Sequence, residues 1–147
     1  MAAALRNRHR RGAVFSDIVF IAIESAITLA WVRVLLRVAP RRVLGGVLEH
    51  GGGGRPADSR LIAIFKRTAA HVPFAHNCMH RSLALQRMLA RRGTAAQLRI
   101  GIGAKPNLFP GHAWLECGGA VINDDPELVR RYAPLVISQS ALEVTYQ

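Results

Sequence analysis

The sequence has few cysteines, few acidic residues and little lysine, and each shortage narrows the possible classes of protein. Two cysteines in 147 residues cannot form the disulfide framework on which many small secreted domains depend. The 50% apolar content is too high for a disordered tail, and the chain is too short for two ordinary domains. We therefore expect one compact domain with a hydrophobic core of its own.

Acidic residues are the scarcer charged class, with 9 Asp and Glu against 20 Lys and Arg and a formal net charge of +11. All the basic residues except Lys66 and Lys105 are arginine. Such a charge suits an anionic partner such as nucleic acid or a membrane surface. An arginine excess beside abundant alanine and glycine is also typical of coding bias. We therefore favour a solvated basic face, or a patch for an acidic peptide, over a nucleic-acid surface.

Long uncharged apolar runs are also missing. The apolar stretch 18–38 contains Glu24, Arg33 and Arg37, and its longest run without a charge is Ser25 to Val32. That run is far below the ~20 residues of a membrane span, and no clean cleavage site for a secretory signal follows it. Its charges are not collected on one basic face, which disfavours a membrane-surface helix. We expect a cytoplasmic protein without stable membrane insertion.

The first 55 residues differ in pattern from the rest. We interpret 1–13 as a frayed basic arm, followed by a long helix that Ser16 caps and Pro40 stops. This helix has no single broad polar face, so we expect it to pack on the rest of the domain or to dock a partner. The glycines from Gly51 to Gly54 form a flexible connector to a core over residues 56–147.

The second half of the chain carries clearer helix and strand patterns. Apolar spacing predicts two helices and then three strands, over residues 58–68, 79–92, 96–103, 112–116 and 120–123. Asp58 or Ser59 caps the first of these helices, and Gly93 ends the second. Residues 105–111 form a loop. The fold class is therefore α+β, with a central helix packed on a small antiparallel sheet and preceded by N-terminal helices.

Cys78 lies at the start of the central helix, where a nucleophile is well placed. Free backbone N–H groups and the positive end of the helix dipole stabilise a thiolate there, and Arg81 adds positive charge. The same N–H groups, including that of Cys78, can donate to the oxyanion of a tetrahedral intermediate. Taken alone, a cysteine at the head of an apolar helix is more often a small packed side chain. A nucleophilic role therefore needs partner residues.

His112 and Asp124 are those partners if the hairpin pairs them. With a three-residue loop over 117–119, His112 lies opposite Asp124, with Cβ atoms about 4.5–5.5 Å apart. The carboxylate then orients the imidazole, which takes the cysteine proton. A two-residue turn would put Asp125 opposite His112, and the glycine pair 118–119 suits either turn. We favour Asp124.

These residues and their neighbours resemble the transglutaminase-like cysteine peptidases of lasso-peptide biosynthesis, over about residues 60–137. The segments that carry the resemblance are Cys78 to Leu85, Leu89 to Gly93, Leu98 to Gly103, His112 to Glu116 and Val121 to Asp124. The resemblance implies Cys78 as the nucleophile, His112 as the general base and acid, and Asp124 as the orienting carboxylate. It implies a transglutaminase/papain-like peptidase core. We expect neither a cofactor nor a metal.

The resemblance also implies a function and partners. In this family the enzyme removes the leader from a ribosomally made precursor peptide, and a separate asparagine-synthetase-like cyclase closes the ring. Some members carry a fused leader-recognition domain, whereas the region ahead of the match here has a helical pattern. We therefore expect a stand-alone peptidase that needs a separate leader-recognition protein. The N-terminal helix is a candidate surface on which a partner docks, and the cyclase is a further candidate partner. The alternatives are a transglutaminase-like acyl transferase and a non-enzymatic, basic nucleic-acid-binding module.

The remaining polar residues receive simpler interpretations. Cys117 at the hairpin tip lacks metal-ligand spacing to its neighbours, and a zinc site drawn from His71, His76, Cys78 and His80 is disfavoured for the same reason.

Several further side chains have structural interpretations as well. Trp114, on the same strand face as His112, either shields the imidazole or simply packs. Asn77 is expected to cap the central helix, and a second oxyanion donor is the alternative role for His76 and Asn77. His80 is expected to be exposed. The basic residues that we expect to be solvated, with peptide binding as the alternative, are Arg81, Arg99 and Lys105.

Overall fold

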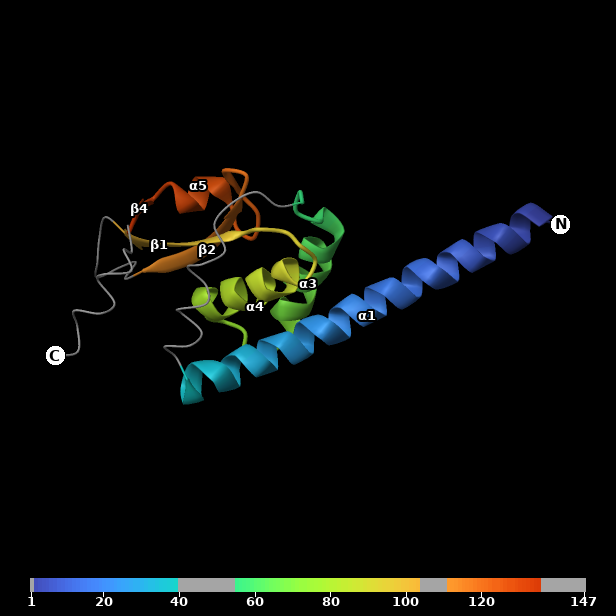
Figure 1. The fold of residues 1–147 in the computed structure, drawn as a ribbon, viewed down its shortest axis with the longest axis horizontal. Coiled ribbons are helices and arrows are strands. Elements are labelled where there is room, and N and C mark those ends of the chain that lie inside the picture. The colour runs from blue at the N-terminus through green and yellow to red at the C-terminus, as the bar shows by residue number, and fades with distance from the viewer. Residues whose placement is uncertain (1, 40–54, 104–110, 136–147) are drawn as a thin grey trace.

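The computed structural model describes residues 2–39, 55–103 and 111–135, and of residues 2–13 the backbone alone. The predicted connector Gly51–Gly54 and the loop residue Lys105 lie outside these ranges. The elements stack in layers, with the long helix α1 first, then α3 and α4, then a four-stranded sheet, and the short helix α5 beyond it (Figure 1). The predicted α+β class is confirmed, and the helix that begins with Cys78 packs on the sheet.

The core lies where α1, α3 and α4 meet and where α4 covers the sheet. Its largest fully buried apolar side chains are Phe65, Leu29, Leu61, Leu85, Met88, Leu89 and Leu115. Leu115 belongs to the strand β2, so the sheet and the helices share one core.

Helix α1 runs from Ala2 to Val38. The predicted frayed arm over 1–13 and the predicted cap at Ser16 are therefore wrong, because the helix already includes the residues from Ala2 onward. Alanine and arginine make up most of that stretch and are strong helix formers, so the helix extends through it. At the other end, α1 stops two residues ahead of Pro40, as the sequence predicts.

One face of α1 packs along α3 (Ser59–His71) and α4 (Cys78–Ala90). Leu29 and Val32 of this face are 0% and 2% exposed, and Ser25 is fully buried beside them. The sequence predicts that this helix packs on the domain or on a partner, and this face packs on the domain.

An ion pair fastens α1 to the end of α4. The guanidinium of Arg92 donates to both carboxylate oxygens of Glu24, at 3.1 and 2.6 Å. The side-chain hydrogen bond to Glu24 raises the pKa of Arg92 and outweighs the opposite effect of burial. The negative charge of Glu24, which interrupts the apolar stretch of α1, is therefore balanced by a basic residue of the domain.

By length and composition alone, Val14–Val38 is long and apolar enough to cross a membrane, with a mean hydropathy of 2.0. The sequence argument that its charges exclude a span is therefore too strict. One such helix near the N-terminus is weak evidence for a span, because core helices and signal sequences share these properties. The packing of α1 argues against a span, since crossing a bilayer would strip one face of the helix from the core.

The ends of α3 and α4 follow the predicted capping. The Asp58 side chain accepts hydrogen bonds from two backbone N–H groups in the first turn of α3, at 2.9 and 3.2 Å. The Asn77 side chain accepts the N–H of Met79 at 2.9 Å and caps α4. Beyond α4, Gly93 has a φ of +75°, a left-handed conformation that favours glycine.

His80 is buried, and the prediction that it is exposed is wrong. Its side chain lies between α4 and α1, where Nε2 is 2.6 Å from the carbonyl oxygen of Leu29. The ring of Phe74 stacks on the imidazole with 6.2 Å between centroids. A histidine with a hydrogen-bond partner can be buried at a helix contact, whereas sequence patterns treat it as a polar surface residue.

The sheet has the strand order β3-β2-β1-β4, and all three pairings are antiparallel. The strands are β1 (Gln97–Gly103), β2 (His112–Cys117), β3 (Ala120–Val121) and β4 (Tyr132–Pro134). Helix α5 (Pro126–Val129) lies between β3 and β4 in the chain. The sequence predicts β1, β2 and β3 but misses α5 and β4.

The hairpin of β2 and β3 closes with a two-residue turn, so the predicted three-residue loop is wrong. Cys117 pairs with Ala120, which leaves Gly118 and Gly119 as the turn, with φ values of +58° and +81°. Positive φ at both positions is typical of a type I′ turn, which matches the twist of a hairpin and favours glycine. The ladder between these strands covers only two residue pairs.

Candidate active site

Cys78 is the first residue of α4, and its thiol is free and half-buried. Asn77 immediately precedes it and holds the helix start in two ways. Its side chain accepts the N–H of Met79, and its backbone carbonyl accepts the N–H of Arg81 at 3.1 Å. The cap fixes where the helix begins, so Cys78 and the first N–H groups of α4 have a defined direction.

A buried serine one turn further along α4 connects this helix to the strand β2. Ser82 Oγ donates to the carbonyl oxygen of Ala113 at 3.1 Å and accepts a hydrogen bond from Asn123 Nδ2 at 2.8 Å. Asn123 Oδ1 in turn accepts the backbone N–H of Leu115 at 2.7 Å. One serine and one asparagine therefore join α4, β2 and the segment after β3.

This network turns the Cys78 side of α4 toward the residues predicted to work with it. Ser82 lies four residues after Cys78, and residues four apart share one face of a helix. Its two partners, Ala113 and Asn123, are the chain neighbours of His112 and Asp124.

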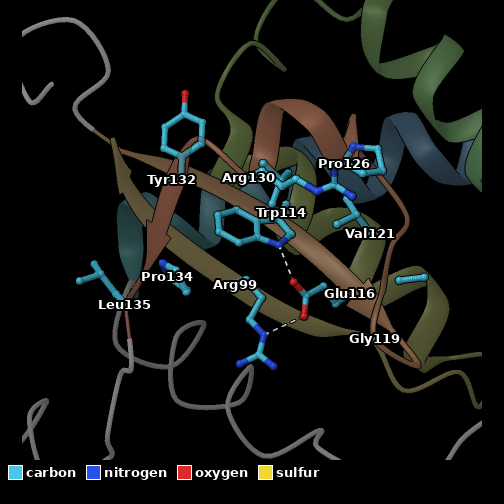
Figure 2. Close-up of a pocket in the computed structure, with 12 residues that line it drawn as sticks. Arg99, Trp114, Glu116, Gly119, Val121, Pro126, Arg130, Tyr132, Pro134 and Leu135 are labelled. Carbon is cyan, nitrogen blue, oxygen red and sulfur yellow. Dashed lines mark hydrogen bonds and ion pairs between the residues drawn. The ribbon is translucent and has the colours of Figure 1, made fainter. Parts of the chain in front are cut away.

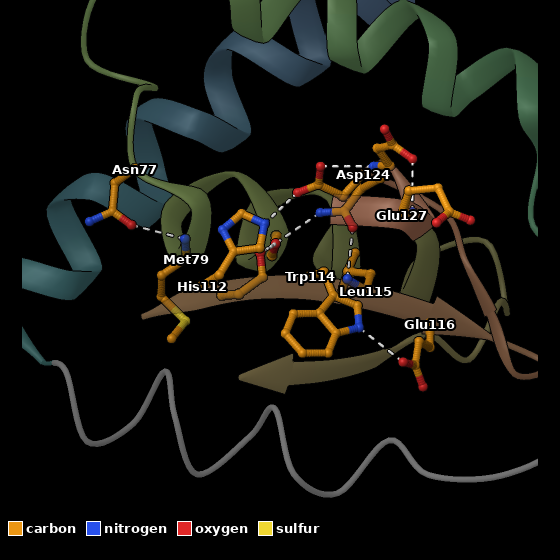
Figure 3. Close-up of polar contacts among 12 residues, drawn as sticks. Asn77, Met79, His112, Trp114, Leu115, Glu116, Asp124 and Glu127 are labelled. Atoms are coloured by element: carbon orange, nitrogen blue, oxygen red, sulfur yellow. Dashed lines mark hydrogen bonds and ion pairs between the residues drawn. The ribbon is translucent and has the colours of Figure 1, made fainter. Parts of the chain in front are cut away.

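His112 and Asp124 are in direct contact (Figure 3). The Nε2–H of His112 donates to Asp124 Oδ2 at 2.6 Å, and the other carboxylate oxygen accepts the backbone N–H of Asp125 at 2.8 Å. The two side chains are 15% and 24% exposed. Asp125, the alternative in the sequence, instead caps α5 by accepting the N–H of Glu127 at 2.9 Å. The structure thus brings Asp124, and not Asp125, to the imidazole.

Asp124 reaches His112 by a different route from the predicted ladder. The two-residue turn, if its register continued, would align Asp125 with His112. The strand β3 ends at Val121, however, and Asn123 uses its side chain to accept a backbone N–H of β2. The chain leaves the ladder there, so Asp124 meets the imidazole from beyond the end of the strand.

The second imidazole nitrogen, Nδ1, lies on the side of the ring away from Asp124. In Figure 3 this nitrogen is turned toward Asn77 and Met79, the residues on either side of Cys78. With the Nε2–H donated to a carboxylate, Nδ1 carries the lone pair that can accept a proton.

Two aromatic rings stack beside the imidazole of His112. The Tyr132 ring centroid lies 4.9 Å away and the Trp114 centroid 6.2 Å away, with interplanar angles of 28° and 22°. Trp114 is 2% exposed, and its Nε1–H donates to Glu116 at 2.9 Å. Trp114 therefore packs as a buried residue and also covers the imidazole, so both predicted roles apply.

Gly101 makes room for these rings. It pairs with His112 in the ladder between β1 and β2. A Cβ on Gly101 would lie 2.8 Å from the Tyr132 Cβ and 2.9 Å from the Trp114 ring, closer than such atoms approach in proteins. A side chain at this position would push the rings away from the imidazole.

An open pocket of about 650 Å³ adjoins the same rings (Figure 2). Trp114 and Tyr132 line it together with Arg99, Glu116 and Arg130. Arg99 donates to Glu116 at 3.1 Å, so part of its charge is already compensated. A peptide segment bound in this pocket would lie next to the Trp114 and Tyr132 rings that stack on His112.

The other candidates from the sequence lie apart from this site or are engaged elsewhere. Cys117 is a free cysteine at the far end of β2 from His112. His71 Nδ1 lies 2.8 Å from the Arg67 carbonyl oxygen, and His80 contacts α1 as described above. Within the described ranges, no three His, Cys, Asp or Glu side chains are grouped so as to hold a metal ion.

Three residues that shape the site received no role from the sequence. Ser82 and Asn123 carried a usable signal, because Ser82 lies one helical turn from Cys78 and Asn123 adjoins Asp124. Tyr132 carried none, because β4 has three residues and shows no pattern of its own.

A family model described as the transglutaminase-like superfamily matches residues 25–137. The matched region contains Cys78, His112 and Asp124. The microcin J25-processing protein McjB of Escherichia coli is 44% identical to this chain over 55 residues, which are 37% of this chain and 26% of McjB. The match therefore spans about a quarter of the length of that curated relative. The comparison with solved structures found no match.

Proposed function

The chain belongs to the transglutaminase-like superfamily, and we propose that it is a cytoplasmic cysteine peptidase that removes the leader from a lasso-peptide precursor. Three findings support this proposal: the family match over most of the chain, the local identity to a protein named for microcin J25 processing, and the contact between His112 and Asp124. The lasso-peptide substrate also follows from the sequence segments that resemble this class of peptidase.

The hydrogen bond between His112 and Asp124 is the observation that carries the proposal. A carboxylate that accepts Nε2–H fixes the tautomer of the imidazole and stabilises its protonated form. The fixed tautomer leaves Nδ1 as the base, on the side of the ring toward the start of α4. We assign Cys78 as the nucleophile, His112 as the general base and acid, and Asp124 as the orienting carboxylate.

The proposed reaction has two steps. Cys78 Sγ attacks the scissile carbonyl, and His112 Nδ1 takes the thiol proton and gives it to the leaving amine, which is the new N-terminus of the core peptide. Water, activated by the same imidazole, then hydrolyses the thioester and releases the leader. The N–H of Cys78, which begins the helix that Asn77 caps, is suited to stabilise the oxyanion of both tetrahedral intermediates.

The partners form part of the same proposal. The precursor peptide is the substrate, a separate leader-recognition protein presents the leader, and the asparagine-synthetase-like cyclase receives the released core. Part of the peptide is proposed to bind in the open pocket of Figure 2, beside the rings that cover His112.

The first test compares two cysteine variants. Cys78→Ala and Cys117→Ala are incubated with precursor and recognition protein, and cleavage is followed by mass spectrometry. We expect Cys78→Ala to lose essentially all turnover, because removing one member of a catalytic unit costs nearly as much activity as removing all of them. Cys117→Ala should keep its turnover. Iodoacetamide is expected to label Cys78 before Cys117. Undiminished cleavage by Cys78→Ala would refute the assignment.

The second test separates the two neighbouring aspartates. We expect Asp124→Ala to lose activity by orders of magnitude, as in other catalytic units. Asp125→Ala should lose only the cap of α5, worth about 1 kcal/mol of stability. If Asp125→Ala were inactive and Asp124→Ala active, the orienting role of Asp124 would be wrong.

The products distinguish this proposal from its alternatives. Hydrolysis gives a leader with a free carboxylate, whereas acyl transfer to an amine gives a conjugate of different mass. A nucleic-acid-binding module would show affinity that falls steeply with salt and no cleavage dependent on Cys78.

A further inference from the structure

The outward face of α1 carries a continuous apolar stripe. Its six side chains are at least half exposed, namely Phe20 65%, Ile23 54%, Ile27 63%, Trp31 50%, Val34 51% and Val38 78%. With about 100° between successive residues, these side chains fall within about 80° of arc and extend over about 27 Å of helix. We call them the α1 stripe. A helix packed on a domain normally turns polar residues to the solvent side, so an exposed apolar stripe indicates an interaction surface.

The acidic groups of α1 are held by the domain. Glu24 is paired with Arg92 at 2.6 Å, and Asp17 lies 3.8 Å from Arg60. Arg37 near the helix end is exposed. More arginines precede the apolar stretch in the sequence, at Arg6, Arg8, Arg10 and Arg11. In the sequence of α1, six arginines stand against two acidic residues, so the formal charge of this helix is positive and complements an anionic surface.

We propose that the α1 stripe binds an anionic phospholipid membrane, with the axis of α1 parallel to the membrane surface. An apolar helix face sinks about 5–10 Å into the interface, and flanking arginines then lie among the lipid headgroups. The opposite face of α1 stays on the domain, held by the Glu24–Arg92 pair and by the contact of His80 with Leu29. The helix lies on the membrane and does not cross it. The scattered charges of this segment disfavour a membrane-surface helix at the level of sequence, but the structure pairs both acidic side chains with basic residues of the domain and leaves the α1 stripe exposed.

A second copy of the chain fits the α1 stripe less well. Pairing two stripes would bring together two chains with a net charge of +11 each. Asp17 and Glu24, the acidic residues of α1, already face basic partners within the chain and do not offset this repulsion. An anionic bilayer supplies both the apolar interior and the opposite charge.

Membrane binding through α1 leaves the candidate active site accessible. The layer of α3 and α4 separates α1 from the sheet (Figure 1). The pocket lined by Trp114 and Tyr132 would therefore remain open to water and to a peptide. This proposal does not depend on the peptidase assignment.

The test is sedimentation of the full chain with vesicles of phosphatidylcholine alone or mixed equally with phosphatidylglycerol. We expect binding to the mixed vesicles, about tenfold weaker binding to the neutral ones, and loss of the difference at high salt. Trp31 reports the insertion, because Trp114 is already buried and only Trp31 is half exposed. Trp31 fluorescence should shift to shorter wavelength with mixed vesicles, and Trp31→Phe should remove the shift while preserving binding.

Matched variants locate the binding surface. Phe20→Ser and Ile27→Ser should each weaken vesicle binding about tenfold or more, because each removes a large apolar side chain from the interface. Ile102→Ser, at a 42% exposed residue of β1, should leave binding unchanged. Circular dichroism of each variant checks that the helices are retained. Should Ile27→Ser fail to fold, Phe20→Ser and the Trp31 signal still test the proposal.

Two outcomes would overturn the proposal. The first is a vesicle-binding result: either the wild-type chain fails to bind mixed vesicles, or Ile102→Ser weakens vesicle binding as much as the stripe variants do. The second is a concentration-dependent dimer that Ile27→Ser abolishes, without vesicle binding, which would identify a second copy as the occupant. Neither outcome affects the cleavage assays, so failure here is distinguishable from failure of the proposed function.

Discussion

Replacing Ser82 by alanine tests whether the buried network holds α4 in place. Ser82 is fully buried, and its hydroxyl both donates to Ala113 and accepts from Asn123. The variant removes the acceptor of the Asn123 amide and one donor to the Ala113 carbonyl. A buried polar group left without a partner costs about 1–3 kcal/mol, so we expect Ser82→Ala to lose about 2–3 kcal/mol of unfolding free energy. That is a large share of the roughly 5–15 kcal/mol of a typical domain.

The measurement is urea unfolding followed by circular dichroism, with Ser16→Ala as the matched control. Ser16 is exposed on α1, so its substitution should stay within about 0.5 kcal/mol of the wild type. In thermal unfolding, the Ser82 variant should melt about 2–4 °C lower for each kcal/mol lost.

A double-mutant cycle with Asn123→Ala isolates the bond between the two side chains. We expect the double variant to be less destabilised than the sum of the single variants, with a coupling of about 1 kcal/mol. Catalytic turnover should fall in both single variants, because the network orients the Cys78 end of α4 relative to His112. A loss of stability below about 0.5 kcal/mol in Ser82→Ala would refute the reasoning, and so would strict additivity.

Three further substitutions follow from the packing. Gly101→Ala would place a Cβ 2.8 Å from the Tyr132 Cβ, so we expect a loss of about 1–3 kcal/mol in urea unfolding together with lower turnover; wild-type stability would contradict this. Gly119→Ala meets no neighbouring atom but must keep a φ of +81°, so it should cost about 1–2 kcal/mol and leave cleavage unchanged. Glu24→Gln leaves Arg92 without its charged partner and should cost about 1–3 kcal/mol. The raised pKa of Arg92 keeps its guanidinium charged from neutral to moderately alkaline pH, so the loss of unfolding free energy in Glu24→Gln should be constant over that range. A loss that decreases as the pH rises would contradict this role of the ion pair.

Local features could be predicted well from the sequence because short-range chemistry determines them. Asp58 and Asn77 cap their helices through their own side chains, and Gly93 has the left-handed conformation expected after a helix. The alternation of apolar and polar residues over 97–100 is likewise visible between sequence neighbours, and β1 forms there. The positions of Cys78 and His112 at the starts of their elements followed from these features.

Features that depend on distant contacts were missed or misassigned. The turn at Gly118–Gly119 suits either hairpin length, and the pairing of Asp124 depends on Asn123 leaving the ladder, which no local pattern encodes. His80 is buried because α1 covers it, a contact between residues 51 positions apart. The three residues of β4 pair with residues of β1 that lie 29 to 33 positions away in the chain.

The network around Ser82 also bears on when the chain becomes able to react. Its hydrogen bonds join residues 31 and 41 positions apart, whereas α4 itself is held by bonds within one or two turns. Helix α4 can therefore form early in folding, while the docking of the hairpin must wait for slower closure of long loops. A chain whose hairpin has not docked on α4 therefore has Cys78 without His112 and Asp124 beside it. If the proposed function is correct, recovery of precursor cleavage after refolding should lag behind recovery of helical circular dichroism, because the thiol is present before its proposed partners are in place.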